Sequence, residues 1–246
     1  MENEPRVAVV TGANKGIGKH IARQLAQAGL LVFIGSRNHA RGQAAVDELR
    51  SEGLSVRLLG LDVTDSASLA QAAAQVALDP GRLDVLVNNA GITSGLDAAS
   101  QMSIDDLRRT YETNVFGVAT TINMFLPLLR QSPSPRIVNV SSGLGSLTLL
   151  SDLTFPFAAL NNAAYQSSKT ALNALTVLYA KDLAKEGFKV NAVSPGYRAT
   201  DLNGGLPAPG AGDPAEGAEV AVRMALIADD GPTGEFHSHT GTTYPW

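Results

Sequence analysis

Tyr165 and Lys169 are the two residues whose types and spacing most directly suggest chemistry. They stand four positions apart in residues 161–172, a run of good helix formers, so both side chains should leave the same helical face as neighbours. A free tyrosine titrates near pH ~10, and a nearby positive charge favours its ionised form. We therefore expect Lys169 to lower the pKa of Tyr165 toward the working pH and to make the phenol a general acid. The same spacing also occurs on ordinary surface helices, so other motifs must support this interpretation.

The composition is typical of one soluble domain. The chain has 246 residues, 44% of them hydrophobic, which is enough to bury a large core. Its net charge of -4 offers no basic stripe for nucleic acid, and no apolar run is long enough to cross a bilayer. The absence of cysteine argues against disulfides and thiolate metal sites, and the first residues lack a signal-peptide pattern. We expect a cytoplasmic protein without nucleic-acid or membrane partners.

Three glycines follow the first predicted strand. Residues 6–11 are apolar and β-branched, which predicts a strand buried on both faces of a parallel sheet. Gly12, Gly16 and Gly18 then precede an amphipathic helix predicted over residues 17–28. Glycines at such a turn let the backbone approach a pyrophosphate, which the free N–H groups of the helix N-terminus can bind. The pattern indicates a dinucleotide site, with an ordinary glycine turn as the alternative.

Two cations stand where such a site would meet the adenosine ribose. Arg37 directly follows the second predicted strand, residues 30–36, and Lys15 lies in the glycine turn. An acid at the strand end would accept a hydrogen bond from the ribose 2′-OH, whereas an arginine accommodates a 2′-phosphate. The charges predict NADP(H) as the cofactor, although either one alone could be a solvated surface charge.

Strands and helices alternate along the whole chain. Helices are predicted over residues 39–52 and 65–78, over a long segment from 103 to the break at 132–135, and again up to Gly187 and from Pro214. Strands are predicted over residues 55–61, 83–88, 136–142, 188–194 and 234–237. This alternation predicts an α/β fold with a Rossmann-type, doubly wound parallel sheet of about seven strands and helices on both faces. We expect one dinucleotide-binding domain over residues 1–246, with a substrate loop and helix at about 196–230.

Five motifs in this order resemble the short-chain dehydrogenase/reductase family, and in particular its NADPH-dependent carbonyl reductases. They are Thr-Gly-x-x-x-Gly-Ile-Gly at the glycine turn, Asn88-Asn89-Ala90-Gly91 after the fourth strand, Asn114, Ser142, and the pair Tyr165 and Lys169. The resemblance covers essentially the whole chain.

The resemblance implies catalytic roles for four residues. Tyr165 would protonate the developing alkoxide, and Ser142 would hydrogen-bond the same oxygen. Lys169 would hold the ribose and lower the tyrosine pKa, and Asn114 would position a water of a proton relay. Ser141 is the alternative hydroxyl, and a buried, satisfied asparagine that bends its helix is the alternative for Asn114.

The resemblance also implies a set of cofactor contacts. Asp62 and Val63 would meet the adenine, although Asp62 or Asp65 could instead cap a helix, and Thr200 would reach the nicotinamide carboxamide. The full set is Gly12, Asn14, Lys15, Gly16, Ile17, Gly18, Arg37, Asp62, Val63, Asn89, Ala90, Gly91, Tyr165, Lys169, Pro195, Gly196 and Thr200.

Other segments bear on the substrate. An apolar loop at residues 143–160 offers Leu147, Phe155 and Phe157 as pocket-lining residues or as ordinary core. Arg198 stands where a small or apolar residue is expected. His237 and His239 alternate on an extended segment without a third ligand nearby, so we expect no metal site.

The expected reaction is reversible hydride transfer between the nicotinamide and a carbonyl or alcohol, with a hydrophobic small-molecule substrate. A redox-sensing binding module without turnover is the alternative, since this fold also serves such roles. The family commonly pairs the helices that carry Asn114 and Tyr165, which predicts a homodimer or homotetramer. The 143–160 loop could cover that surface and leave a monomer.

Overall fold

The computed structural model describes residues 5–200, 202 and 210–246, and these residues form an α/β fold built on one sheet. Seven strands lie parallel in the order β3-β2-β1-β4-β5-β6-β7 in this part of the chain. They are β1 (Val7–Val10), β2 (Leu31–Ser36), β3 (Val56–Gly60), β4 (Val85–Asn88), β5 (Arg136–Val140), β6 (Lys189–Ser194) and β7 (Phe236–Ser238). The direction of winding reverses between β1 and β4, which confirms the predicted doubly wound sheet.

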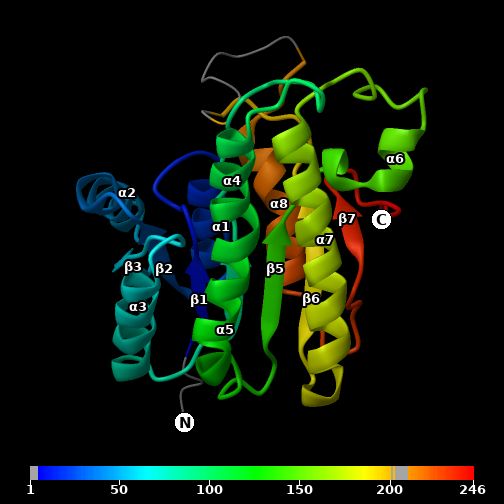
Figure 1. Cartoon of the computed structure of the whole chain (residues 1–246). Coiled ribbons are helices and arrows are strands. Elements are labelled where there is room, and N and C mark those ends of the chain that lie inside the picture. Colours follow the sequence, from blue (N-terminus) through cyan, green and yellow to red (C-terminus); the bar gives the residue numbers. More distant parts are fainter. Residues whose placement is uncertain (1–4, 201, 203–209) are drawn as a thin grey trace.

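Helices cover both faces of this sheet (Figure 1). One face carries α1 (Gly16–Gln27), α2 (His39–Ser51) and α8 (Pro214–Ala225), and the other carries α3 (Ser66–Leu78), α5 (Gly117–Leu129) and α7 (Ala163–Leu183). The shorter elements are α4 (Ile104–Tyr111), the π-helical turn η1 (Glu112–Phe116), α6 (Leu147–Ser151) and the 3-10 turns η2 (Gly143–Gly145) and η3 (Ala184–Glu186). None of the described helices is long and apolar enough to cross a membrane.

Strand β1 is apolar throughout because its side chains pack into two hydrophobic cores, one on each face of the sheet. In β1, Ala8 and Val10 pack toward α1 and α8, whereas Val7 and Val9 pack toward α3, α5 and α7. All four side chains are buried, as expected for successive residues that point to opposite faces of a doubly covered sheet. This burial explains why the sequence pattern located the strands to within two residues at each end.

Two segments differ from the sequence prediction. The helix expected to run from residue 103 to the break at 132–135 is interrupted by η1, which carries Asn114 and widens the backbone by one π turn. The segment 143–160, expected as a loop, begins with η2 and α6. Hydroxyls nucleate both turns, because Ser142 Oγ accepts from Leu144 N and Ser146 Oγ accepts from Leu149 N.

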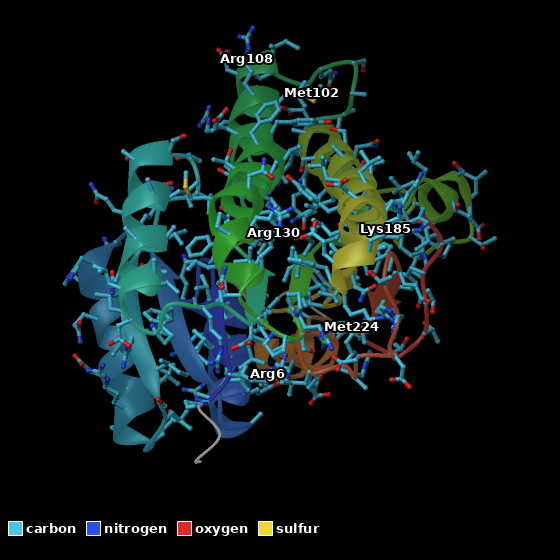
Figure 2. All side chains as sticks on the ribbon, turned by 90° about the horizontal axis from the view of Figure 1, so that it is seen from below. Arg6, Met102, Arg108, Arg130, Lys185 and Met224 are labelled. Carbon is cyan, nitrogen blue, oxygen red and sulfur yellow. The ribbon has the colours of Figure 1, made fainter. Side chains whose placement is uncertain are left out.

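Polar contacts close the end of the sheet opposite the strand carboxyl ends. Figure 2 views this end from below and shows α8 on the opposite side of the strands from α5 and α7. Arg130 at the end of α5 pairs with Glu186 at 2.7 Å, and the fully buried Arg136 donates to Ile227 O and pairs with Asp229 at 2.7 Å. These contacts lie at the start of the strands, at the opposite end of the sheet from the carboxyl edge where doubly wound sheets bind their ligands.

A buried polar chain connects the centre of the sheet to α7. Asn88 Nδ2 donates to Asn139 Oδ1 at 2.9 Å, and Asn139 Nδ2 donates to Thr176 Oγ1 at 2.9 Å. These three residues are at most 2% exposed and belong to β4, β5 and α7. These buried hydrogen bonds therefore fix the position of α7 relative to the strand ends. This helix carries Tyr165 and Lys169.

We predict that Asn139→Leu lowers the free energy of unfolding by about 1–3 kcal/mol, because it leaves the Asn88 donor without its acceptor and removes the donor to Thr176 in a dry core. Urea denaturation of both proteins would measure the change. Gln131→Leu, at an exposed position, serves as the control and should leave the midpoint within error. Equal midpoints for Asn139→Leu and the wild type would show that the buried chain is dispensable.

Candidate active site

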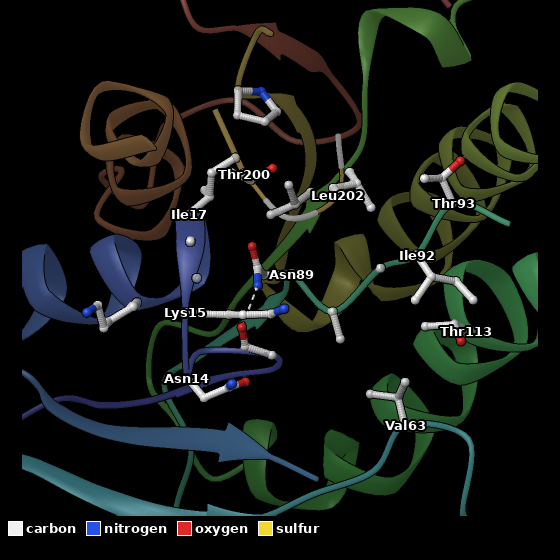
Figure 3. A pocket seen from close by; sticks show the side chains of 18 of the residues that line it. Asn14, Lys15, Ile17, Val63, Asn89, Ile92, Thr93, Thr113, Thr200 and Leu202 are labelled. Atoms are coloured by element: carbon white, nitrogen blue, oxygen red, sulfur yellow. Dashed lines mark hydrogen bonds between the residues drawn. The ribbon is translucent and has the colours of Figure 1, made fainter. Parts of the chain in front are cut away.

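A cavity of about 610 Å³ lies at the carboxyl ends of the strands, beside the β1–β4 reversal. Figure 3 shows Asn14, Lys15 and Ile17 of the glycine turn facing Asn89 and Ile92, with Val63 and Thr200 on further sides. Of the predicted cofactor contacts, all line this cavity except Gly196. The catalytic candidates Tyr165 and Lys169 also line it, whereas Asn114 and Ser142 stand one contact behind the wall.

The glycine turn has no room for larger residues. Gly12 adopts a φ of 64°, and a Cβ there would lie 3.0 Å from Ala90 Cα. A Cβ at Gly18 would lie 2.3 Å from Asn89 Nδ2 and 2.6 Å from Gly12 O. Only glycine allows this close approach between turn, helix and neighbouring strand end, which is the geometry that exposes the N-terminus of α1 to a phosphate.

Thr11 and Asn89 bind the two strand ends on either side of the reversal together. Thr11 Oγ1 accepts from Asn89 N at 3.0 Å and from Ala90 N at 2.9 Å. Asn89 Nδ2 donates to Thr11 O at 2.9 Å and to Gly12 O at 3.2 Å. The Asn89 amide and the Thr11 hydroxyl thus join the ends of β1 and β4.

The residues expected to meet an adenosine moiety surround one end of the cavity. Arg37 and Lys15 both line it with exposed side chains. Of the two acids that could cap a helix, Asp65 is the one that caps α3. Its Oδ1 accepts hydrogen bonds from Ala67 N and Ser68 N. Asp62 instead accepts from Thr64 and lines the cavity.

Tyr165 is held at the opposite end of the cavity by the first turn of α7. Asn162 caps this helix, since its Oδ1 accepts from Tyr165 N at 3.2 Å, while its Nδ2 donates to Thr93 Oγ1 at 2.8 Å. The cap fixes the helix start against the loop after β4. The Tyr165 ring is 9% exposed, and its hydroxyl is hydrogen-bonded to Ser142, which follows β5.

Burial raises the pKa of Tyr165 to about 12, and the hydrogen bond from Ser142 lowers it only in part. The expectation that Lys169 would lower this pKa is therefore wrong for the protein alone. The lysine ammonium lies 5.6 Å from the centre of the ring, and removal of the phenol from water outweighs other effects. Tyr165 remains a neutral phenol, the form that can donate a proton.

Lys169 is also buried, with 4% exposure, and burial lowers its pKa to about 8. Its Nζ donates to Val140 O at 2.9 Å, at the end of β5. A Cβ added to Gly91 would lie 3.5 Å from Lys169 Nζ and 3.4 Å from Asn114 Oδ1. The side chains of Lys169 and Asn114 therefore both end next to Gly91. The lack of a side chain at residue 91 leaves room for that convergence.

Asn114 is fully buried in the π turn, and its side-chain amide both donates to and accepts from the backbone of Ile92. Its Oδ1 accepts from Ile92 N at 2.9 Å, and its Nδ2 donates to Ile92 O at 2.9 Å and to Ser168 Oγ at 3.0 Å. Asn114 thus clips the loop after β4 to α7. This geometry matches the alternative of a satisfied asparagine in a distorted helix, and it also holds Asn114 next to Lys169.

The two serines after β5 point in different directions. Ser142 is half-buried and reaches Tyr165, whereas Ser141 is 2% exposed and its Oγ donates to Asn173 Oδ1 of α7 at 2.6 Å. Ser141 also borders the cavity, but its hydroxyl is used by α7. Of the two hydroxyls, the one beside Tyr165 is that of Ser142.

Comparison with known proteins agrees with this geometry. The family model described as short chain dehydrogenase matches residues 6–209. This chain belongs to the short-chain dehydrogenase/reductase family.

Individual relatives match over nearly the whole chain. Salutaridine reductase of Papaver bracteatum is 35% identical over 296 aligned positions, which cover 94% of each protein, and (+)-neomenthol dehydrogenase of Arabidopsis thaliana is 36% identical, covering 96% of this chain and 97% of the relative. The solved structure of an NADPH-bound carbonyl reductase from chicken fatty liver superimposes with a TM-score of 0.85 at 28% identity, covering 99% of this chain and 100% of the other. As a member of this family, the protein is a dehydrogenase or reductase.

The residues expected to line the substrate pocket of this short-chain dehydrogenase lie outside the cavity that the cofactor candidates line. Leu147, Phe155 and Phe157 do not line the 610 Å³ cavity. Phe155 and Phe157 instead contact each other edge to face at 5.7 Å between ring centres, and Phe157 also lies 6.2 Å from the Tyr197 ring. Leu147 is 61% exposed and Phe157 is 38% exposed, so neither is a core residue.

The loop after β6 brings Pro195 and Thr200 to the cavity, while Gly196 packs behind it against the His239 ring. No cluster of three or more potential metal ligands occurs among the described residues, which include His237 and His239. Of the expected substrate loop and helix at 196–230, residues 201 and 203–209 lie outside the described residues.

Several residues that shape the site of this dehydrogenase were missed by the sequence analysis. Thr93 and Thr113 line the cavity, and Ser168 and Asn173 hold Asn114 and Ser141 in place. Ser168 and Asn173 each follow a catalytic candidate on α7 at helical spacing, the signal that could have identified them. Thr93 and Thr113 carry no such signal, because their proximity arises only from folding.

We predict that Lys169→Met changes how stability depends on pH. Burial lowers the Lys169 pKa from 10.5 to about 8. While the side chain is an ammonium, this shift destabilises the folded state by roughly 3 kcal/mol. That penalty is fully present below pH 8 and disappears as pH rises toward 10.5, since the folded protein then binds fewer protons than the unfolded one. The wild type should therefore gain roughly 2–3 kcal/mol relative to Lys169→Met between pH 8 and pH 10.

Urea denaturation at both pH values would measure this difference. Lys181→Met, an exposed position on the same helix, is the matched control and should show a difference that does not depend on pH. A pH-independent difference for Lys169→Met would mean that this ammonium is solvated.

Proposed function

We propose that this protein is an NADP(H)-dependent oxidoreductase that interconverts a ketone or aldehyde and the corresponding alcohol, with Tyr165 as the proton donor. The observation that carries the proposal is a neutral, buried phenol that is hydrogen-bonded to Ser142 and lines the 610 Å³ cavity beside the glycine turn. We further propose that residues 1–246 act as one dinucleotide-binding unit that contains the catalytic residues.

Tyr165 and Ser142 act on the carbonyl oxygen. Because the Tyr165 pKa is about 12, the hydroxyl keeps its proton at neutral pH and can transfer it as negative charge develops on the substrate oxygen. Ser142 donates its hydroxyl hydrogen to the same oxygen and stabilises that charge. For oxidation the proton moves in the opposite direction, from the alcohol to Tyr165.

Lys169 and Asn114 support the proton transfer. Once Tyr165 has donated its proton, the ammonium of Lys169 stabilises the phenolate, because an opposite charge within a few Å favours the ionised form. The same ammonium, which lies next to Gly91, would hold a ribose hydroxyl. Asn114, fixed by Ile92 next to Lys169, positions a relay water that returns a proton from solvent.

The residues present fit the cofactor that this function requires. The side-chain-free surface at Gly12 and Gly18 admits a pyrophosphate at the N-terminus of α1, and Arg37 and Lys15 face the end where a 2′-phosphate would lie. Thr200, packed 3.6 Å from the position of a Gly16 Cβ, would hold the carboxamide. NADP(H), when bound, supplies the hydride, and the protein residues orient the partners and handle the proton.

The expected substrate is a hydrophobic carbonyl compound. Phe157 and Tyr197 form a partly exposed aromatic surface next to the loop that carries Thr200, and Phe155 lies close to Gly143, which follows Ser142. Such a surface contributes area rather than charge and so favours flat, apolar substrates.

We predict that Tyr165→Phe reduces turnover by about 10²–10⁴-fold while NADPH affinity stays nearly unchanged, because only the proton donor is removed. Steady-state reduction of a panel of aryl and cyclic ketones, with fluorescence titration of NADPH, would separate the two effects. Ser142→Ala should be similarly impaired and Ser141→Ala should retain most activity.

More than a tenth of wild-type activity in Tyr165→Phe would refute the mechanism, and the reverse ranking of the serines would reassign the hydroxyl. NADPH binding without turnover of any carbonyl compound would instead support a redox-sensing binding module.

We predict that the wild type prefers NADPH over NADH by about tenfold or more, since a charge-assisted contact to a 2′-phosphate contributes roughly 1.5–3 kcal/mol. Arg37→Asp should reverse or abolish this preference, because a carboxylate accepts from a ribose 2′-OH and repels a phosphate. The ratio of kcat/KM values for the two cofactors measures both effects. Equal use of NADH by the wild type would show that Arg37 and Lys15 are ordinary surface charges.

We also predict a homodimer or homotetramer. In Figure 1, α6 lies to the side of α7 near the C-terminal end of the chain and leaves α5 and α7 uncovered at the front. Phe116 in η1 and Leu178 in α7 are 55% and 59% exposed. Light scattering should give at least twice the chain mass of 25.6 kDa, and Leu178→Glu should shift the protein toward the monomer. A wild-type mass equal to one chain would refute the prediction.

A further inference from the structure

Arg198 is a buried charge in the loop after β6, at a position where a small or apolar residue was expected. It is 8% exposed, and its Nε donates to Pro195 O at 2.7 Å within the same loop. Its Nη1 donates to Glu216 Oε2 at 3.1 Å, in the first turn of α8. Because burying a guanidinium is costly unless it is paired and hydrogen-bonded, these contacts fix where the side chain can lie.

Two glycines make room for the Arg198 side chain. A Cβ on Gly212 would lie 1.8 Å from Nη1, and a Cβ on Gly217 would lie 2.9 Å from Cγ. The backbone on both sides is paired as well, since Ala199 N donates to Gly212 O at 3.1 Å and Gly212 N donates to Tyr197 O at 3.0 Å. Arg198 therefore joins the loop after β6 both to residue 212 and to α8.

The segment held by Arg198 forms one wall of the cavity. Pro195, Ala199 and Thr200 line the cavity from this loop, and Pro214 lines it from the start of α8. Thr200 lies against the glycine turn, with its Cγ2 3.6 Å from the position of a Gly16 Cβ. A shift of the loop relative to α8 would therefore move Thr200 with respect to the glycine turn.

We propose that Arg198 is a positioning residue that sets the affinity for NADP(H) by holding Thr200 at its place in the cavity. The proposal rests on the proposed function, because it takes Thr200 to be a cofactor contact. Arg198 is not among the described residues that line the cavity, so in this proposal it acts through the loop. Its ion pair with Glu216 fixes the loop to α8, so cofactor affinity should depend on this pair.

The test uses NADPH as the probe and measures its Kd by fluorescence titration, together with kcat at saturating NADPH. Arg198→Met keeps the aliphatic stem and removes the hydrogen bonds to Pro195 O and Glu216. The Kd should therefore rise roughly five- to tenfold, in the range of one neutral hydrogen bond such as that from Thr200, while kcat changes less than threefold. Arg198→Lys should recover part of the affinity. Glu216→Gln should raise the Kd two- to threefold, and Glu219→Gln, exposed on the same helix, is the matched control that should leave it unchanged.

A double-mutant cycle distinguishes positioning from general loss of structure. In a Thr200→Val background, Arg198→Met should raise the Kd less than twofold further, because both changes remove the same contact. Additive effects, or an unchanged Kd in Arg198→Met, would overturn the proposal. If Arg198→Met does not fold, an unchanged Kd in Glu216→Gln overturns it. Failure of the wild type to bind NADPH at all would refute the proposed function instead, so the two failures differ.

Discussion

The hydrogen bonds between Thr11 and Asn89 are the contacts on which the site depends. They join the ends of β1 and β4, the two strands at which the sheet reverses its winding, through backbone and side-chain groups of both residues. Chain segments leave these two strand ends toward opposite faces, so a crevice forms between them. The tie sets the width of that crevice, and Gly12 and Gly18 keep it clear of side chains. The cavity, the exposed start of α1 and the position of Gly91 all follow from this one junction.

Burial controls the chemistry of the residues at the other end. Tyr165 and Lys169 are both removed from water, which raises the pKa of the phenol to about 12 and lowers that of the ammonium to about 8. Burial disfavours the charged form of each group, so the two shifts have opposite directions and one cause. The phenol therefore keeps its proton, which is the form that a proton donor needs, and the ammonium beside it favours the phenolate once the proton has been given up. The helix cap at Asn162 and the buried chain from Asn88 to Thr176 hold this pair in register with the strand ends.

The two sides of the cavity are built by different means. The cofactor side consists of strand ends and tight turns whose positions are fixed by the sheet. The opposite side is formed by the loop after β6 and the start of α8, which are joined by the contact between Arg198 and Glu216 and by backbone hydrogen bonds at Gly212. The aromatic side chains of Phe157 and Tyr197 join this loop to the segment after Ser142. One side of the cavity is thus fixed by the sheet, whereas the other depends on contacts of particular side chains.

The sequence by itself determined the order of strands and helices, the glycine turn and the identity of the catalytic candidates, because these follow from local periodicity and from residue types at fixed spacing. It could not determine the direction of the Tyr165 pKa shift, because desolvation depends on everything that surrounds the ring, whereas the spacing of four residues reveals only Lys169. The π turn at Asn114 and the different orientations of Ser141 and Ser142 likewise depend on partners from distant segments, Ile92, Asn173 and Tyr165. The sequence likewise identified Arg198 as an unusual residue for its position. Only the tertiary structure shows that Glu216 pairs with its charge and that Gly212 leaves space for its guanidinium.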